Sequence, residues 1–333
     1  MVRSTIDRTN ESPLSVTLTS CVLFLFFSVS ATIFTEASKL EDGTYPYNTF
    51  VIPCAVEAVK LVASSAMFVY ERTARGDSQT PASLFTGFTI RGFAAYAFPA
   101  FCYFVSNNCM FYIIWHLGAS TFQIMNNLKV LSTGVFMRVF LNRKLTWMQW
   151  KALIMLVIGC MVTQLSTIAV GGGHAVDQSF LAGYALVFVS AIASGAGGVF
   201  SEKLLKAKGT EQQKSNGREN SIHWKNIQLY LFGMIFGLVS LRMDTKSESL
   251  PRQNLFDGFN AFAYATVASL AICGLLVSFI LKYLDNVAKC FCTALSMLCV
   301  ALLDSAMKHE MIPLRVVLGI ILTGLALEQY NLS

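Results

Sequence analysis

A lysine, Lys129, stands inside the apolar stretch 118–138. If this stretch is one helix, the cation lies about 11 residues from its start. A rise of about 1.5 Å per residue then places it about 16 Å deep, near the middle of a bilayer whose apolar core is about 30 Å thick. A lysine at that depth costs about 2.5–3.5 kcal/mol on insertion scales. We therefore expect the charge to be used, most simply to hold an anion inside the membrane.

Amide side chains share a face with this lysine. At spacings of three or four residues, the polar stripe runs through Gln123, Asn126 or Asn127, and Lys129. The preceding apolar stretch contains Asn107 and Asn108. Amides can read a nucleobase edge or sugar hydroxyls, and lysine is a natural phosphate partner. The alternative is polar contact between helices, worth about 0.6 kcal/mol each, but a central lysine favours binding.

Three further groups could join such a site. Glu57 and Lys60 are three residues apart, so they form either an internal ion pair that lowers the insertion cost or a cation facing a water-filled cavity. Asn226 and Tyr230 share a helix face and are either ligand contacts or an anchor at the membrane interface. A short turn carries two lysines that either reach a phosphate or are ordinary cytosolic charges; they are Lys282 and Lys289.

No catalytic or metal-binding pattern accompanies these residues. The sequence contains no nucleophile with a histidine partner, no metal motif and no phosphate-cradling glycine-rich loop, so we expect neither an enzyme nor a cofactor. The nine cysteines lie mostly in apolar segments and are expected to be packing residues. The glycine-rich segment 194–198 is expected to let helices approach closely.

The composition indicates a membrane protein. Of 333 residues, 54% are hydrophobic and 13% are charged, about half the charged share of soluble domains. Mean hydropathy is +0.55. The net charge is +6, but the positive residues do not form a basic cluster on a soluble domain. This distribution argues against a nucleic-acid partner. We expect an all-α polytopic membrane protein in a lipid bilayer.

Ten apolar segments are long enough to span a bilayer. The predicted spans are 16–36, 47–70, 91–115, 118–140, 147–170, 179–201, 224–243, 259–281, 287–307 and 312–331. A tight corner at 115–118 separates the third from the fourth. When charges near span ends are counted with the adjoining loops, 17 of the 25 Lys and Arg fall on one side and six on the other, and Lys60 and Lys129 remain inside spans. This asymmetry predicts that both termini are cytosolic.

The ten spans divide into two five-helix halves. We expect a cytosolic segment 1–15, a first repeat 16–175 and a second repeat 176–333 that carries a polar cytosolic loop, 202–223. Moving the second half back by 167 positions aligns 312–318 with 145–151 and 283–284 with 116–117. Halves with five helices are inverted relative to each other, an arrangement that secondary transporters use to build a midplane site.

At these motifs the chain resembles the nucleotide-sugar transporter family, in the group that carries CMP-sialic acid, UDP-galactose and UDP-N-acetylglucosamine. The resemblance rests on Glu57-Ala-Val-Lys60, Asn107-Asn108 with Phe122-Gln123 to Leu128-Lys129, Ser194 to Lys203, Asn226-Ile-Gln-Leu-Tyr230, and Lys282-Tyr-Leu-Asp-Asn286 with Lys289. It implies a ten-helix drug/metabolite-transporter fold. It also implies an antiporter that exchanges cytosolic nucleotide sugar for luminal nucleoside monophosphate.

The resemblance also implies roles for individual residues. Lys129 and Lys282 would bind phosphate, and Lys60 would stand near the sugar or phosphate end. The nucleotide would be contacted by Asn226 and Tyr230, in a cavity also lined by Asn108 and Gln123. Golgi residence is implied, with the endoplasmic reticulum as the alternative, and partners would include a second copy of the chain or a glycosyltransferase.

Two departures from the family pattern bear on the cargo. Phe122 stands where relatives often have tyrosine, and Phe232 where the sialic acid transporters have a small hydroxyl residue. Each removes a polar contact, so we favour a UDP-sugar. The alternatives are a CMP-sialic acid-type transporter and a non-transporting scaffold that anchors glycosylation enzymes through 202–223.

Overall fold

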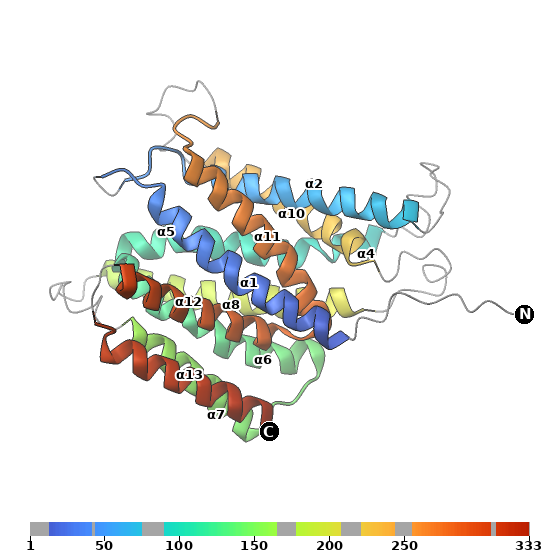
Figure 1. The fold of residues 1–333 in the computed structure, drawn as a ribbon. Helices are drawn as coiled ribbons and strands as arrows, with labels where there is room; N and C mark the ends of the chain where they lie inside the picture. Colours follow the sequence, from blue (N-terminus) through green and yellow to red (C-terminus); the bar gives the residue numbers. More distant parts are fainter. Residues whose placement is uncertain are drawn as a thin grey trace, which may run out of the picture.

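A computed structural model describes residues 13–41, 44–74, 90–164, 178–207, 221–243, 255–307 and 311–332, and these residues contain helices but no strands (Figure 1). The helices are α1 (Pro13–Ala37), α2 (Val51–Ala74), α4 (Ile90–Ala94), α5 (Ala97–Met125), η1 (Asn126–Leu128), α6 (Lys129–Leu141), α7 (Trp147–Thr163), α8 (Gln178–Lys206), α10 (Ile222–Met243), α11 (Ala261–Tyr283), α12 (Asn286–Met307) and α13 (Leu314–Leu332). The predicted half-boundary near 175 and most of the 202–223 loop lie outside the described residues, as does most of the segment 1–15.

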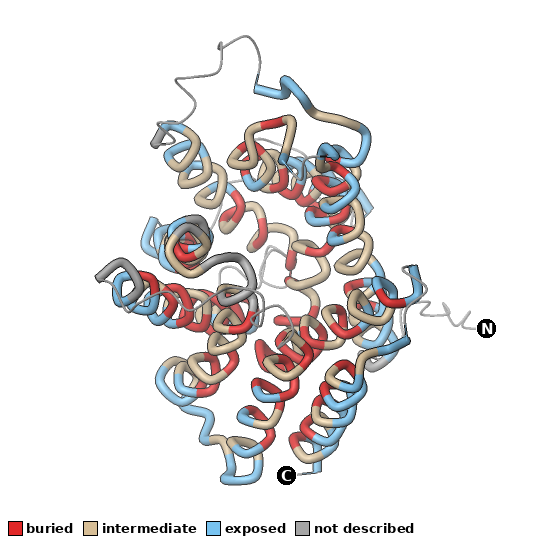
Figure 2. Tube along the Cα trace, turned by 90° about the vertical axis from the view of Figure 1, so that its left-hand side faces the viewer, coloured by how far each residue is buried: buried red, intermediate tan, exposed pale blue. Residues whose placement is uncertain are grey.

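Within the described residues, six helical segments are long and apolar enough to cross a membrane. They are Ser15–Ala37, Val51–Ala74, Ile90–Ile114, Leu181–Lys206, Ala261–Tyr283 and Asn286–Met307. Helices satisfy their backbone hydrogen bonds internally, as a lipid environment requires. Figure 2 shows buried residues where the helices face one another and exposed residues on their outer sides. The chain is therefore a multi-pass membrane protein.

Five helix pairs make the most extensive contacts: α5 with α8, α7 with α13, α1 with α11, α2 with α10, and α6 with α8. Glycines in the predicted close-approach segment allow α8 to touch two neighbours. A Cβ on Gly195 would overlap Oγ of Ser132, and one on Gly198 would lie 2.5 Å from Nδ2 of Asn286. Such contacts leave no room for a side chain, so α6 and α12 both press against the backbone of α8.

The structure corrects the expected corner at 115–118, which lies within α5 and not in a loop. The chain nevertheless reverses close to this point. Cys102 lies beside Gly197 whereas Leu117 lies beside Gly183, so α5 runs antiparallel to α8 over these residues. Figure 1 shows α6 returning through the bundle, also in contact with α8. The continuous helical hydrogen bonding of α5 therefore hides a change of direction that the sequence indicated.

The sequence predicted Lys129 in the middle of one helix, whereas the structure places it where a new helical segment begins. The 3-10 turn η1 follows α5 directly, and Lys129 is the first residue of α6. The backbone stays helical through this junction, and the N–H of Lys129 donates to the backbone oxygens of Asn126 and Asn127. The attraction of Lys129 for a negative ligand therefore comes from its side chain and not from a free backbone N–H.

Candidate substrate site

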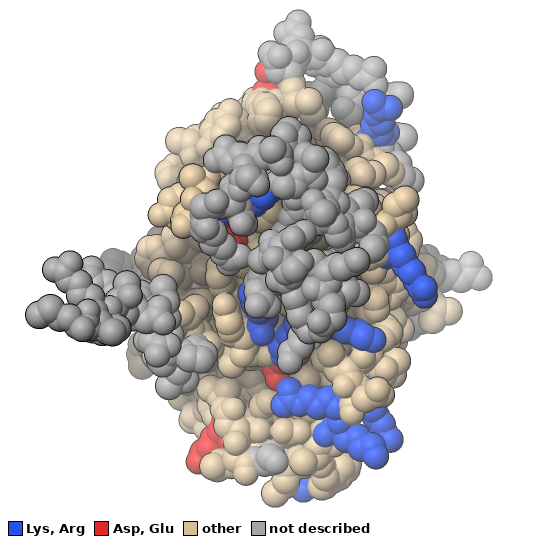
Figure 3. Space-filling view, turned by 90° about the vertical axis from the view of Figure 1, so that its right-hand side faces the viewer, with Lys and Arg blue, Asp and Glu red and all other residues tan. Residues whose placement is uncertain are grey.

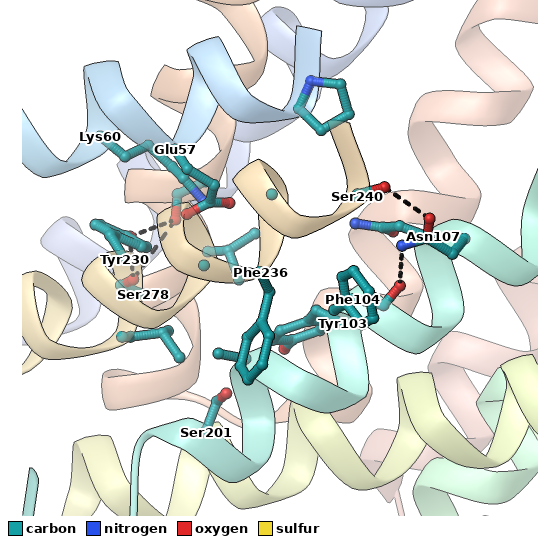
Figure 4. Close-up of a pocket in the computed structure, with 18 of the residues that line it drawn as sticks. Glu57, Lys60, Tyr103, Phe104, Asn107, Ser201, Tyr230, Phe236, Ser240 and Ser278 are labelled. Carbon is teal, nitrogen blue, oxygen red and sulfur yellow. Dashed lines mark hydrogen bonds and ion pairs between the residues drawn. The ribbon is translucent and has the colours of Figure 1, made fainter. Parts of the chain in front are cut away.

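A cavity of ≈ 320 Å³ opens among α2, α5, α8, α10, α11 and α12 (Figure 4). It contains six of the residues that the sequence singled out: Glu57, Lys60, Asn107, Asn108, Tyr230 and Lys289. Its other polar residues are Tyr103, Ser201, Ser240 and Ser278. A concave apolar site with a few convergent polar groups is the usual form of a small-molecule site.

Glu57 and Lys60 form an ion pair beside Tyr230. Nζ of Lys60 lies 2.5 Å from Oε1 of Glu57 and 4.3 Å from the centre of the Tyr230 ring. Two glycines make room for the pair: a Cβ on Gly233 would lie 2.7 Å from Glu57 Oε2, and one on Gly274 would lie 2.5 Å from Lys60 Cδ. The ion pair therefore forms and also lines the cavity, so the two alternatives from the sequence do not exclude each other.

The hydroxyl of Tyr230 is held by α11. It lies 3.0 Å from Oγ of Ser278 and donates to the backbone oxygen of Gly274 at 3.2 Å. The side chain is 3% exposed. Tyr230 therefore joins α10 to α11 while its ring supports the cation of Lys60.

Lys289 lines the cavity, and Lys129 lies close enough to it for the two cations to repel each other electrostatically. Both side chains are partly exposed. Among the described residues, neither lysine has an ion-pair partner; Lys60 and Lys206, by contrast, are paired with Glu57 and Glu202. Two interior cations without a carboxylate leave local positive charge for a ligand to neutralise.

Other predicted residues lie away from this lining. Lys282 packs its Nζ 5.5 Å from the centre of the Tyr283 ring and is not a cavity residue. Asn226 is completely buried, and neither atom of its amide has a hydrogen-bond partner within the described part of the chain. Asn126 faces a small separate hollow, and Asn127 donates to the backbone oxygen of Ile124 at 3.2 Å. The side chain of Gln123 lies outside the described residues.

The sequence did not single out several residues that line the cavity. Phe104 and Phe236 resemble lipid-facing or core residues in any apolar helix, and Tyr103 is equally inconspicuous. Helical spacing could nevertheless have linked two of these residues to polar neighbours. Tyr103 and Asn107 are four residues apart, as are Phe236 and Ser240, so each pair shares a face.

Polar contacts tie several helix ends together beyond the cavity. Arg143, in the link between α6 and α7, lies 2.7 Å from Asp285 before α12. The buried carboxylate of Glu202 accepts from the backbone N–H of Asn286 at 2.8 Å and from Lys206. Figure 3 shows that Lys and Arg side chains gather on the face of the bundle where these helix ends lie.

The chain is similar to known proteins over most of its length. The family model for nucleotide-sugar transporters matches residues 13–331. A protein named CMP-sialic acid transporter 1 from Arabidopsis thaliana is 30% identical over 93% of this chain and 88% of its own length. Its namesake from Oryza sativa subsp. japonica is 33% identical over 92% of both chains. The UDP-galactose translocator of Homo sapiens is 36% identical over 60% of this chain and 48% of its own length.

A solved crystal structure supports the fold. It has a TM-score of 0.66, covers 96% of this chain and 97% of its own, and is 13% identical in sequence. The relatives are named as transporters and not as enzymes, and the apolar helices agree with transport across a membrane. The chain belongs to the nucleotide-sugar transporter family.

Proposed function

We propose that the chain is an antiporter that exchanges a cytosolic nucleotide sugar, with a UDP-sugar as the favoured cargo, for a luminal nucleoside monophosphate. The observation that carries this proposal is the pair Lys129 and Lys289, which have no carboxylate partner among the described residues while one of them lines the cavity. Phosphate oxygens would offset the cost of these cations through charge-assisted hydrogen bonds.

We assign the phosphate role to Lys289 together with Lys129. The resemblance suggested Lys282 for this role, but Lys282 lies outside the cavity lining and Lys289 lies within it. Asn226 and Tyr230 remain candidates for nucleotide contact. The unpartnered amide of Asn226 supports its candidacy, because a buried amide costs free energy until something hydrogen-bonds to it.

Alternating access would rest on ten spans in two inverted repeats of five. Two observations support this architecture. The 167-residue offset moves the start of α7 at Trp147 to 314, where α13 begins. The same offset relates α1 to α8 and α5 to α11, so the packed pairs α1–α11 and α5–α8 become equivalent. The pairs α2–α10 and α7–α13 then join each helix to its own counterpart, which is the pattern of a two-fold axis.

The charge balance of the cavity favours a neutral sugar. Glu57 already neutralises Lys60, so this pair offers no net charge to a carboxylate on the sugar. Phe122 and Phe232 each remove a polar contact and likewise favour a UDP-sugar over CMP-sialic acid. CMP-sialic acid remains the second candidate cargo, because the relatives that match most of the chain carry that name.

A Golgi membrane with both termini cytosolic is the proposed location, supported by the UDP-galactose relative and by the distribution of positive charge. The endoplasmic reticulum is the alternative. A scaffold without transport is the competing function. Deleting 208–220 should leave transport intact if the chain is a transporter, whereas a scaffold would show no uptake of any nucleotide sugar.

A thermal-shift screen of the purified protein with UMP, CMP, GMP and AMP tests the cargo class. A ligand that binds the folded state raises the melting temperature by mass action, with about 2.7 kcal/mol of added stability at 100 times Kd. We expect the largest shift with UMP. A shift with CMP alone would replace the UDP-sugar by CMP-sialic acid, and no shift with any nucleotide would contradict the transport proposal.

A further inference from the structure

Two phenylalanine rings in the cavity wall have no role in the contacts described above. Phe104 of α5 and Phe236 of α10 both line the cavity, with ring centres 5.5 Å apart and planes inclined by 35°. Both side chains are partly exposed. Figure 4 shows the Phe236 ring extending toward Phe104 and Tyr103. In a cavity that also carries charged side chains, these rings present an apolar surface that suits a flat, apolar face of a ligand.

A third phenylalanine contacts both rings from outside the cavity. The Phe101 ring centre lies 5.8 Å from that of Phe236 and 6.2 Å from that of Phe104. Phe101 itself is not among the cavity residues, and it is 49% exposed. Phe101 therefore belongs to the same aromatic cluster without reaching the cavity, so its replacement changes the cluster but not the cavity surface. We refer to Phe104 and Phe236 together as the aromatic wall.

Amide groups stand beside the aromatic wall. Asn107, one helical turn after Phe104, lines the cavity and is exposed. Asn108 is fixed in orientation, because its Oδ1 accepts from Ser240 at 2.7 Å and its Nδ2 donates to the Phe104 backbone oxygen at 2.8 Å. An amide offers a donor and an acceptor side by side, which matches the edge of a nucleobase. Flat stacking surfaces flanked by amides are how proteins hold unpaired bases.

We propose that the aromatic wall stacks the pyrimidine base of the nucleotide and that Asn107 hydrogen-bonds to the edge of that base. This inference rests on the proposed function, since it names the part of the nucleotide that the wall holds. A hexose fits the wall less well, because its hydroxyls need several hydrogen-bonding groups and the nearby Ser240 hydroxyl already donates to Asn108. Lys289, in the same cavity, remains available for the phosphate.

Binding measurements on the purified full-length protein test the assignment. We compare Phe104→Leu and Phe236→Leu with the control Phe101→Leu, which changes the same cluster outside the cavity, and with the conservative Phe236→Tyr. The probes are UMP, a UDP-hexose, and ribose 5-phosphate, which lacks a base. We expect the Kd for UMP to rise about 5- to 100-fold in the first two variants, since stacking on a ring contributes roughly that factor. It should change less than twofold in Phe101→Leu. Phe236→Tyr keeps an aromatic ring and should bind UMP more tightly than Phe236→Leu, and ribose 5-phosphate should bind all variants alike.

Three results would overturn the inference. One is UMP binding in Phe104→Leu and Phe236→Leu equal to that of Phe101→Leu. Another is weaker UDP-hexose binding with unchanged UMP binding, which would place the sugar on the wall. The third is an equal loss of ribose 5-phosphate, which would mean that the rings shape the site as a whole. Because the rings lie on different helices, a folding defect in one variant leaves the other informative. If the wild type binds no nucleotide, the proposed function itself fails, and the inference fails with it.

Discussion

At the scale of single residues, spacing predicted which side chains share a helix face but not which way that face points. Glu57 and Lys60 form the expected pair at 2.5 Å because three residues separate them on one helix. Lys282 and Lys289 lie on either side of a turn, so their directions depend on how α11 and α12 are rotated. Only the packed structure shows that Lys289 lines the cavity and Lys282 does not.

Replacing Gly274 by alanine should move Lys60. A Cβ at this position would lie 2.5 Å from Cδ of Lys60, so the side chain must leave its place over Tyr230. Overpacking of this kind costs about 1–3 kcal/mol. We expect a lower melting temperature and at least a tenfold loss of nucleotide-sugar uptake. Gly324→Ala is the matched control, because a Cβ there meets nothing within 4 Å and alanine favours the helix. Equal behaviour of the two variants would contradict the close fit of Lys60.

At the scale of elements, apolar length predicted most helices and turn chemistry predicted few of their ends. The predicted spans 259–281 and 287–307 correspond closely to α11 and α12. The reversal near 115–118 has no proline or glycine pair to end the helix, so the loop expected there is replaced by continuous helix and the 3-10 turn η1. Long-range packing on α8, which no local pattern records, determines that geometry.

Asp285 connects two elements, and its replacement should separate two effects. Its Oδ1 accepts from the backbone N–H of Ala288 at 2.8 Å, which caps α12, and its Oδ2 accepts from Arg143 at 2.7 Å. Asp285→Ala removes the cap and the ion pair, with an expected loss of about 1–2 kcal/mol. Asp285→Asn retains a capping side chain. Because the Arg143 side chain is 45% exposed, the ion pair alone contributes less than about 1 kcal/mol.

Thermal unfolding should therefore place Asp285→Asn and Arg143→Gln near the wild type and Asp285→Ala clearly below both. Identical melting temperatures for Asp285→Ala and Asp285→Asn would show that the cap does not stabilise α12. Arg143→Gln as unstable as Asp285→Ala would show instead that the ion pair dominates.

At the scale of the whole molecule, composition and apolar repetition were enough to predict a multi-pass helical protein, and the motifs were enough to predict its family. The cavity could not be predicted in the same way. Its lining comes from six helices, and residues such as Phe236 and Ser278 become neighbours of Lys60 and Asn107 only through packing. The inverted repeat remains part of our proposal, argued from sequence matches at an offset of 167 and from the pairing of α1 with α11 and of α5 with α8.

The central claim is that a phosphate-bearing cargo is held by Lys289 in this cavity, and exchange in proteoliposomes tests it most directly. Vesicles preloaded with UMP would be given radiolabelled UDP-sugars, with Lys282→Ala as the matched control. A charge-assisted hydrogen bond contributes about 1.5–3 kcal/mol, so Lys289→Ala should lose about 10- to 100-fold of exchange while Lys282→Ala stays near the wild type. Full exchange by Lys289→Ala, or an equal loss in both variants, would contradict the account.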